Sequence, residues 1–446
     1  MELDPQNVEF NRAAEIALET QQPLFLTGKA GTGKTTFLKY LRSVSDKNIA
    51  VAAPSGIAAV NAGGVTLHSL FQIQPSVYPP NDARLRRRAP RGATDRSTIF
   101  DHFRYSNEKR KLLQELDLLV IDEISMVRCD LLDVVDKLLR TFGGGNRGYP
   151  FGGKQELFIG DPFQLPPVAR DDDWSLLEPH YPTPHFFSAE AFLEADPEII
   201  ELQRIYRQSD QVFIDLLNRI RSNEVLDADL SMLNARLAPP GFDLTGGQYV
   251  YLGTHNRLVD RINERELGRL AGPERTYPAY VEGRFPAREY PNEHLLRLRK
   301  GAQVMFIRND PSGEKEFYNG KVGTLEGLED DRLVVVVDRD REIVVRPETW
   351  EKIEYRWDEE EERVEEKVVG RFVQFPIKLA WAITVHKSQG MTFERVLADL
   401  SGAFAPGQVY VALSRCTSLQ GLLLASPLPR QAIISDPSVM EFVAGK

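Results

Sequence analysis

The sequence has few of the features that mark secreted or membrane-bound proteins. Its 446 residues include only two cysteines, Cys129 and Cys416, whose spacing suits neither a disulfide framework nor a zinc site. No apolar run approaches the roughly 18 to 20 residues that a membrane-spanning helix needs, and the first residues lack the basic and apolar segments of a signal peptide. We therefore expect a cytoplasmic protein with no membrane partner.

Two further absences narrow the class of protein. There are no repeats of the solenoid type, and there is no Asn-Lys-x-Asp motif of the kind that reads guanine, which argues against a GTPase-like switch protein. The composition, with 42% hydrophobic and 27% charged residues, is that of a globular protein. Because the chain is too long for one typical domain, we expect two or three domains, each with its own core.

Acidic residues outnumber basic ones, 65 to 55, and the net charge of −10 by itself argues against a polyanionic partner. The charge is unevenly distributed, however. From Asp82 to Lys111 there are ten basic and four acidic residues, a local charge of +6 that suits contact with phosphates. From Glu351 to Lys367 there are four basic and nine acidic residues, a local charge of −5 that predicts a solvated surface hairpin or strand edge.

The order of predicted strands indicates two α/β regions and a β insertion. Apolar segments that alternate with helical patterns predict a parallel sheet from Pro23–Thr27, Ile49–Ala53, Leu116–Asp122 and Gln155–Gly160. A second α/β region begins near Glu198, with predicted strands Gln248–Gly253, Val396–Leu400 and Leu422–Ala425. Short strands with glycine turns between Leu298 and Val373 predict a small inserted β-barrel. We therefore expect domains at 1–192, at 193–297 with 374–446, and at 298–373, with a small basic insertion at about 75–110.

The strongest local signal is the segment Gly28–Thr35, which reads G-x-x-x-x-G-K-T between a predicted strand and the helical segment Thr36–Val44. Its glycines let backbone amides wrap around phosphates, and the helix N-terminus adds partial positive charge. Lys34 is expected to reach the β- and γ-phosphates, and Thr35 to ligate Mg²⁺. The residues expected to bind the nucleotide are Gly28, Ala30, Gly31, Thr32, Gly33, Lys34, Thr35 and Thr36.

Two adjacent acids, Asp122 and Glu123, end an apolar predicted strand. Asp122 is placed to hold the Mg²⁺ shell, and Glu123 to polarise the attacking water. An Asp-Glu pair can also cap a helix, so this assignment depends on the phosphate loop being present in the same chain.

Further motifs follow in order along the chain. They are Gly64–Phe71, Pro150–Gln155, Gly160–Val168, Tyr206–Gln208, Val385–Thr392 and Val409–Arg415. Their order and content resemble the motor motifs of superfamily 1 DNA helicases, and the first two resemble the PIF type (petite integration frequency) within that superfamily. The resemblance extends from Phe25 to Leu424.

The resemblance implies an α/β fold of two RecA-like parallel-sheet motor domains, with a small SH3-like β-barrel inserted in the second. It implies ATP bound between the motors with Mg²⁺, and 5′-to-3′ translocation on single-stranded DNA coupled to the unwinding of duplex or other DNA structures. The implied partners are single-stranded DNA and forked or G-rich structured DNA, and we expect a monomer in solution. Roles in genome maintenance, including DNA repair, recombination and telomere maintenance, follow from the same resemblance.

The resemblance also assigns roles to single residues. Gln164 would sense the γ-phosphate, and Arg207 and Arg415 would reach that phosphate from the second domain as arginine fingers. Gly390 would line the nucleotide site. Gln6 is the candidate adenine-reading glutamine, although the segment Leu3–Asn7 departs from the family pattern.

For DNA, the resemblance implies contacts on both motors. The residues implied are Pro54, Ser55, Gly56, Thr66, His68, Phe163, Thr254, His255, Asn256, Thr384, His386 and Lys387. Short polar groups can bind phosphates without reading sequence, as a translocating motor requires. Phe163 could stack on a base or pack beneath Pro166 and Pro167. The segment Tyr78–Arg110 corresponds to an element that helps to split the duplex, or it is a disordered loop.

Two other motors remain open on the residues. A RecD-type or conjugative helicase shares the same motor motifs, although the Phe-Gly-Gly-x-Gln stretch at Phe151–Gln155 and the compact length favour the PIF type. An RNA-directed motor is the other alternative, because phosphate contacts do not report the 2′-hydroxyl.

Overall fold

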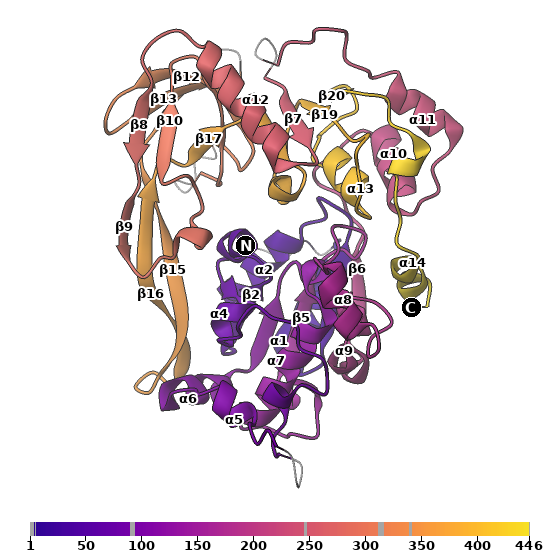
Figure 1. The fold of residues 1–446 in the computed structure, drawn as a ribbon, viewed down its shortest axis with the longest axis vertical. Coiled ribbons are helices and arrows are strands. Elements are labelled where there is room, and N and C mark those ends of the chain that lie inside the picture. The colour runs from indigo at the N-terminus through magenta and orange to yellow at the C-terminus, as the bar shows by residue number, and fades with distance from the viewer. Residues whose placement is uncertain are drawn as a thin grey trace.

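The computed structural model of the protein describes residues 4, 6–89, 94–244, 248–310, 316–338 and 341–445. Arg91 of the basic stretch, and Leu3 and Pro5 beside the candidate adenine-reading glutamine, lie outside these residues. Figure 1 shows two separate sheets, one in the lower half of the view and one at the upper right, with a third, antiparallel region along the left side.

The first sheet consists of parallel strands in the order β3-β2-β4-β5-β1-β6. Their bounds are β1 Leu24–Gly28, β2 Ile49–Ala53, β3 Val65–Thr66, β4 Leu118–Ile121, β5 Gln155–Ile159 and β6 Glu198–Leu202. The four strands that the sequence predicts here correspond to β1, β2, β4 and β5 and are confirmed. Nearly all of their residues are buried, as expected of central strands in a parallel sheet.

The edge strand β6 corrects one expectation. The sequence places it at the start of the second α/β region, whereas the structure pairs it with β1, from Leu24 opposite Glu198 to Gly28 opposite Leu202. That assignment is wrong because the chain adds one more strand to the first sheet before it crosses over. The half-buried residues of β6 are typical of an edge strand, which packs less completely than a central one.

Helices cover both faces of the first sheet, and together they form the first domain. Alternate strand residues pack on one face against α1 (Val8–Glu19) and α2 (Lys34–Val44), and on the other against α7 (Cys129–Phe142) and α9 (Glu190–Ala195). The shorter helices of this domain are α3 Gly56–Ala62, α4 Leu67–Leu70, α5 Ile99–His102, α6 Asn107–Glu115 and α8 Asp171–Leu177. The carboxyl ends of the parallel strands therefore meet at one open edge between the two helical layers.

The second sheet consists of parallel strands in the order β18-β7-β19-β20 and is the centre of the second domain. Its strands are β7 Val250–Gly253, β18 Ala382–Thr384, β19 Val396–Ala398 and β20 Leu422–Leu424. Its helices are α10 Gln211–Arg221, α11 Asp227–Asn234, α12 Asn256–Arg269 and α13 Gln408–Leu413. The three predicted strands are confirmed, and β18 is the one that the sequence missed. The two parallel sheets confirm the predicted pair of RecA-like domains.

The insertion between β7 and β18 is antiparallel, and its strands span a longer part of the sequence than predicted. It contains β8 Arg275–Pro278, β9 Tyr280–Gly283, β10 Leu295–Leu298, β11 Gln303–Phe306, β12 Val322–Leu328, β13 Leu333–Val337, β14 Arg341–Val345, β15 Glu348–Asp358, β16 Arg363–Gln374 and β17 Ile377–Leu379. These strands pair in the orders β14-β13-β12-β11-β17, β15-β16-β9 and β10-β8. The predicted short strands correspond to β11 to β14. The antiparallel structure begins earlier than predicted, with β8, β9 and β10, which start before residue 298. It also ends later, with β17 after residue 373.

The acidic segment Glu351–Lys367 forms most of a long hairpin, β15 and β16, that reaches the first domain near α6 (Figure 1). The hairpin is confirmed, and most of its acidic side chains are exposed as expected, but part of it packs on the first domain. The Val51 amide donates a hydrogen bond to the Tyr355 hydroxyl at 3.1 Å, and Tyr355 is buried in the core of the first domain. Arg42 pairs with Glu366 at 2.6 Å, so basic groups of the first domain offset part of the acidic charge.

The described part of the basic segment packs on the first domain. Leu85, Ile99 and Phe103 are buried in its core, which contradicts a wholly disordered loop over these positions. Arg84 pairs with Asp82 within the segment. Both cysteines are buried free thiols, as expected. Among the described residues we find no helix with the length and apolar composition that crossing a bilayer requires.

Candidate nucleotide and nucleic-acid site

The phosphate loop connects β1 to α2, and its lysine, Lys34, is hydrogen-bonded to the backbone of the loop. Gly31 and Gly33 have φ angles of +83° and +95°, which favour glycine, and they turn the chain so that α2 begins at Lys34. The Lys34 ammonium donates hydrogen bonds to the carbonyl oxygens of Gly28 at 2.6 Å and Lys29 at 3.1 Å. Burial lowers the pKa of this ammonium, although nearby carboxyl groups oppose the shift. The loop therefore offers a cation and a helix N-terminus to a phosphate.

Two acidic side chains follow the end of β4. Glu123 has a left-handed backbone with φ of +52°, and its amide donates to the Asp122 carboxyl at 3.0 Å. Burial and the charge of Glu123 raise the pKa of Asp122 to about 7, and burial raises the pKa of Glu123. Such carboxylates are stabilised when a cation lies beside them.

A magnesium ion fits the oxygen donors at this position. The Thr35 hydroxyl and the Asp122 carboxylate are hard oxygen ligands of the type that Mg²⁺ prefers. Over the described ranges, no group of three or more His, Cys, Asp or Glu side chains could hold a metal ion. Thr35 and Asp122 would therefore hold such an ion together with oxygen atoms from outside the chain, rather than by protein ligands alone.

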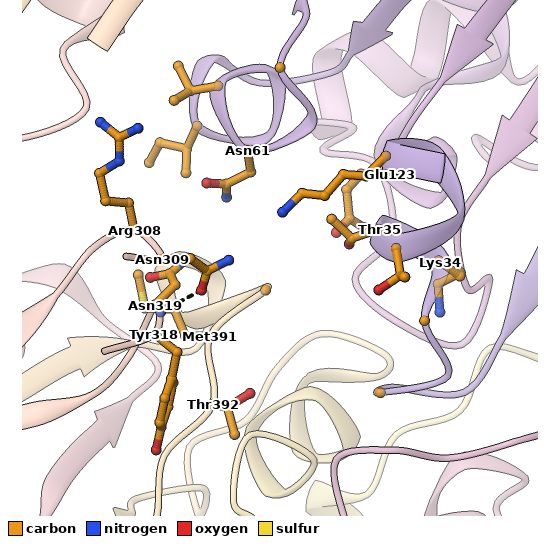
Figure 2. Close-up of a pocket in the computed structure, with 18 of the residues that line it drawn as sticks. Lys34, Thr35, Asn61, Glu123, Arg308, Asn309, Tyr318, Asn319, Met391 and Thr392 are labelled. Atoms are coloured by element: carbon orange, nitrogen blue, oxygen red, sulfur yellow. Dashed lines mark hydrogen bonds between the residues drawn. The ribbon is translucent and has the colours of Figure 1, made fainter. Parts of the chain in front are cut away.

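A single cavity of about 1460 Å³ joins the phosphate loop, the second domain and the insertion. Figure 2 shows Lys34, Thr35 and Glu123 on one side of it, and Asn309 and Asn319 of the insertion on the other. The residues predicted for the nucleotide site that line it are Ala30, Gly31, Thr32, Gly33, Lys34, Thr35, Thr36, Glu123, Gln164, Arg207, Gly390 and Arg415, and Lys387, predicted to contact DNA, lines it as well. Gly28, Asp122 and Gln6 are not among its lining residues. Most of the predicted nucleotide site thus lies in one place, although it is drawn from distant parts of the chain.

The predicted phosphate-sensing groups approach this cavity from both domains. The Gln164 amide donates to the Asp161 carboxylate at 3.3 Å, in the loop that follows β5. Arg207 donates to the Ser414 carbonyl oxygen at 3.2 Å, which holds it beside the second domain. Arg415 is buried and donates to the Val411 carbonyl oxygen at 2.9 Å. Burial lowers the pKa of both arginines. One buried and one half-buried guanidinium group thus lie where a γ-phosphate would provide their negative partner.

Two residues to which the sequence assigned no role line the cavity beside the phosphate loop. Gln6 is exposed, whereas Asn7 and Tyr206 line the cavity. The Asn7 amide donates to the Tyr206 hydroxyl at 3.2 Å. The Tyr206 ring is 57% exposed and lies beside Gly33, where a Cβ would be 3.7 Å from it. An exposed ring next to a phosphate loop offers a flat apolar face to a nucleobase. The only available signal was that Tyr206 directly precedes Arg207.

The predicted DNA contacts of the first domain follow the carboxyl ends of β2 and β3. Ser55 accepts a hydrogen bond from the Ala58 amide at 3.2 Å and caps α3, and Thr66 accepts one from Ser69 at 3.1 Å and caps α4. His68 is half-buried, and burial and nearby arginines lower its pKa, which favours the neutral ring. Pro54 and Gly56 adjoin the same turn. These groups share one edge of the sheet because the strands are parallel.

The predicted contacts of the second domain lie at the corresponding edge of its sheet. Thr254 and His255 follow β7, and the Thr254 hydroxyl lies 2.7 Å from the His255 ring nitrogen Nδ1. Asn256 is the first residue of α12. Thr384 ends β18 and is buried, while His386 and Lys387 are exposed on the turn after it. The structure therefore brings residues 54–56 and 66–68 to the carboxyl edge of the first sheet, and residues 254–256 and 384–387 to that of the second.

The Phe163 ring is more buried than a ring that is free to stack on a base would be. Its ring is partly buried against the core of the first domain, and the guanidinium carbon of Arg221 lies 4.1 Å from the ring centroid. Of the two readings that the sequence left open, this geometry agrees with packing. Arg221 was not predicted from the sequence, because no motif contains it.

Comparisons with known proteins agree with this geometry. A family model described as PIF1-like helicase matches residues 4–225. The ATP-dependent DNA helicase Pif1 of Bdellovibrio bacteriovorus is 30% identical over 452 residues, which cover 99% of this chain and 92% of that protein.

Solved structures of a Pif1 from Bacteroides sp. are 38% identical, and the match covers 100% of this chain and 97% of theirs. The TM-score is 0.89 with the complex with ADP-AlF4 and 0.67 with the complex bound to single-stranded DNA. The unliganded structure from Bacteroides sp. has a TM-score of 0.88, so this chain is more similar to the two structures without DNA than to the DNA-bound one. With nearly the whole of both chains aligned at these identities, the chain belongs to the family of PIF1-like helicases.

Proposed function

We propose that this protein is an ATP-dependent DNA helicase that hydrolyses ATP between its two parallel-sheet domains and translocates on single-stranded DNA. One observation carries the proposal. The phosphate loop of the first domain and Arg207 and Arg415 line the same cavity, although the two arginines follow different strands and helices far along the chain. A reaction that needs groups from both domains couples hydrolysis to their relative movement.

Each side chain has a distinct task in this proposal. Lys34 and the amides of the phosphate loop hold the β- and γ-phosphates, and Glu123 accepts the proton of the attacking water. Gln164, Arg207 and Arg415 stabilise the charge that spreads over the transferred phosphoryl group. Thr35 and Asp122 would hold Mg²⁺, which when bound neutralises phosphate charge and aligns it with these groups.

The DNA part of the proposal rests on the two aligned sheet edges and on the relatives. A Bacteroides Pif1 binds single-stranded DNA, and another structure has two Pif1 helicases at forked double-stranded DNA. On this chain, the predicted groups at residues 54–56, 66–68, 254–256 and 384–387 would bind phosphates of one strand, and movement would run 5′-to-3′. The described basic groups before α6 would stand at the fork. G-rich structured substrates, genome maintenance and a monomeric state are proposed on the resemblance alone, and a cytoplasmic location on the sequence features described above.

We also propose the domain limits. Because β6 belongs to the first sheet, the first motor would extend to about Leu202, and the second would include β7, β18, β19 and β20. The insertion would run from about Arg275 to Leu379, with the strands β11 to β14 as an SH3-like unit.

Strand separation on two forked substrates of opposite tail polarity tests this function. With ATP and Mg²⁺, we expect unwinding only from the 5′ tail, and stronger stimulation of ATPase activity by DNA than by the matched RNA. Unwinding confined to the 3′ tail would reject the proposed polarity, and stronger RNA stimulation would favour an RNA-directed motor.

Two variants assign the chemistry to the cavity. Glu123→Gln should lower kcat by roughly a hundredfold or more while ATP still binds, since it removes only the proton acceptor. Glu19→Gln, an exposed residue at the end of α1, is the matched control and should keep wild-type kcat. Wild-type hydrolysis by Glu123→Gln would overturn the role of Glu123.

A further inference from the structure

Arg221 connects the second domain to the loop that carries the predicted phosphate sensor. It is the last residue of α10, whose residues Phe213, Leu216 and Leu217 are buried in the core of the second domain. Its side chain leaves that domain and is only 11% exposed. The helix therefore anchors one end of an arginine whose charged end lies among residues of the first domain.

Three groups of the first domain surround this guanidinium. Arg221 donates to one Asp161 carboxylate oxygen from Nη2 at 3.1 Å and from Nε at 3.3 Å. Its Nη2 also lies 3.3 Å from a Glu201 carboxylate oxygen, and its carbon lies 4.1 Å over the Phe163 ring. The planar guanidinium can contact two carboxylates with its edge and an aromatic ring with its face. An ammonium group lacks this planar shape.

Asp161 is the point at which these contacts meet the nucleotide site. Its side chain is 0% exposed, so its charge depends on the partners that surround it. The same carboxylate accepts hydrogen bonds from the Gln164 side-chain amide at 3.3 Å and from the Phe163 backbone amide at 3.2 Å. Arg221 thus contacts Asp161, and the Asp161 carboxylate in turn holds Phe163 and Gln164 of the same loop. Of these residues, Gln164 lines the cavity.

A second part of the second domain also fits closely against this loop. Gly407, which precedes α13, has φ of +71°, and a Cβ there would lie 2.4 Å from the Phe163 carbonyl oxygen and 2.6 Å from that of Gln164. Any larger residue would push the loop away. On the same helix, Tyr410 accepts a hydrogen bond from the Ala30 amide of the phosphate loop at 3.0 Å. The second domain therefore holds the sensor loop from two sides.

We propose that Arg221 is a positioning residue that transmits the relative movement of the two domains to the loop 160–166, and so couples DNA binding to ATP hydrolysis. This inference rests on the proposed function. When α10 moves with the second domain, Arg221 pulls on Asp161 and changes where Gln164 points. Arg221 does not reach the nucleotide itself, since it is not among the residues that line the cavity.

The same helix offers a matched control. Arg219 is two residues earlier, and it contacts both oxygens of Asp229 at 2.6 Å and 2.8 Å, within the second domain. Removing it also breaks a bidentate arginine–aspartate pair, but one that does not cross between domains. The comparison therefore separates loss of an ion pair from loss of the link to the sensor loop.

The experiment compares Arg221→Gln, Arg221→Lys and Arg219→Gln with the wild type. For each we measure kcat and KM for ATP with and without an oligothymidine strand, the Kd for that strand and the unwinding rate. Arg221→Gln should lose about tenfold or more of the DNA-stimulated kcat while KM and Kd change less than about threefold, because substrate contacts remain. Arg221→Lys should lose less, since it keeps the charge but not the shape, and Arg219→Gln should match the wild type.

Each outcome bears on one proposal. If the wild type shows no stimulation by DNA, the proposed function fails. If the wild type is stimulated and folded Arg221→Gln is stimulated equally, the positioning role is overturned. Should Arg221→Gln not fold, Arg221→Lys decides the question: a partial loss of coupling supports the role, whereas coupling equal to the wild type overturns it, because the role is assigned to the planar guanidinium. A parallel rise in KM and Kd would also overturn the role, since it would place Arg221 in binding.

Discussion

The ring of Phe442 stacks on the ring of Phe187, with centroids 4.4 Å apart and planes inclined by 6°. Phe442 belongs to α14 (Pro437–Ala444), which follows the second domain in the chain, whereas Phe187 belongs to the first domain. Phe25, Phe186 and Phe192 lie within 6.2 Å of the same ring, centroid to centroid. The last helix therefore returns to the first domain and ties the two domains together on a face away from the nucleotide cavity.

Removing this ring should weaken the tie. Phe442→Ala is expected to destabilise the protein by about 2 to 3 kcal/mol, below the value for a fully buried phenylalanine because the ring is half-buried. Thermal unfolding measures the change as a lower Tm. Val443→Ala on the same helix, at a side chain that is 42% exposed, should change stability by less than about 0.5 kcal/mol. Equal Tm losses in both variants would contradict the stacking account.

A contact between a histidine and an aspartate next to this helix predicts a dependence on pH. The His185 ring nitrogen Nε2 lies 2.7 Å from the Asp436 carboxylate, and this contact, with hydrogen bonds from Ser438, lowers the pKa of Asp436 to about 2. A carboxylate with a depressed pKa stabilises the fold above its ordinary pKa, and the contribution is lost as the pH falls toward its folded value. The Tm difference between the wild type and Asp436→Asn should therefore shrink from about pH 4 to about pH 2.

The control for this titration is Asp260→Asn, at an exposed position of α12. Its Tm should stay close to that of the wild type at every pH. A difference for Asp436→Asn that is constant down to pH 2 would mean that the charge of Asp436 contributes nothing to stability.

The hairpin contact predicts a local change in protection. Tyr355→Phe removes the hydroxyl that accepts the hydrogen bond from the buried Val51 amide, which should cost about 1 to 2 kcal/mol. We expect hydrogen exchange of the Val51 amide to accelerate by about tenfold, measured by mass spectrometry or NMR. Tyr280→Phe, in the neighbouring strand β9 with an exposed ring, should leave that amide unchanged. Unchanged exchange in Tyr355→Phe would show that the hairpin contact does not protect β2.

A glycine-to-alanine substitution is expected to impair catalysis at Gly31 of the phosphate loop and to stabilise the fold at Gly268 of α12. At Gly31, where φ is +83°, a Cβ would lie 2.6 Å from the Arg207 Cβ, so Gly31→Ala should lower kcat/KM for ATP by about tenfold or more. At Gly268, inside α12, no atom lies within 4 Å of an added Cβ, so Gly268→Ala should stabilise the protein by about 0.5 to 1 kcal/mol. ATPase kinetics and Tm check the pair, and wild-type kinetics in Gly31→Ala would contradict the close approach.

Local patterns were sufficient where neighbouring residues make the feature themselves. The phosphate loop was predictable because its glycines and Lys34 are close in sequence and the backbone they form does not depend on distant partners. The central strands β1, β2, β4 and β5 were predictable because full burial requires continuous apolar runs. The acids after β4 could be assigned because a strand end next to a phosphate loop places them at the same sheet edge.

Other features required the fold. Tyr206 and Asn7 meet across 199 residues, and Tyr355 and Val51 across 304, so no spacing in the sequence indicates either contact. The edge strand β6 reads like any short apolar strand, and only pairing decides which sheet it joins. The packing of the acidic hairpin on the first domain could not be predicted from its sequence, because the partners of Glu366 and Tyr355 belong to another domain.

The sequence by itself determined the chemistry, since the phosphate loop, the two acids and the family motifs are short segments whose residue types limit what they can bind. Only the tertiary structure decided how that chemistry is connected. The link from Arg221 to Asp161, the return of α14 and the docking of the hairpin each bury groups from two domains against one another. The physical reason is that a buried charge or ring needs a partner close in space, and chain topology, not sequence spacing, supplies that partner.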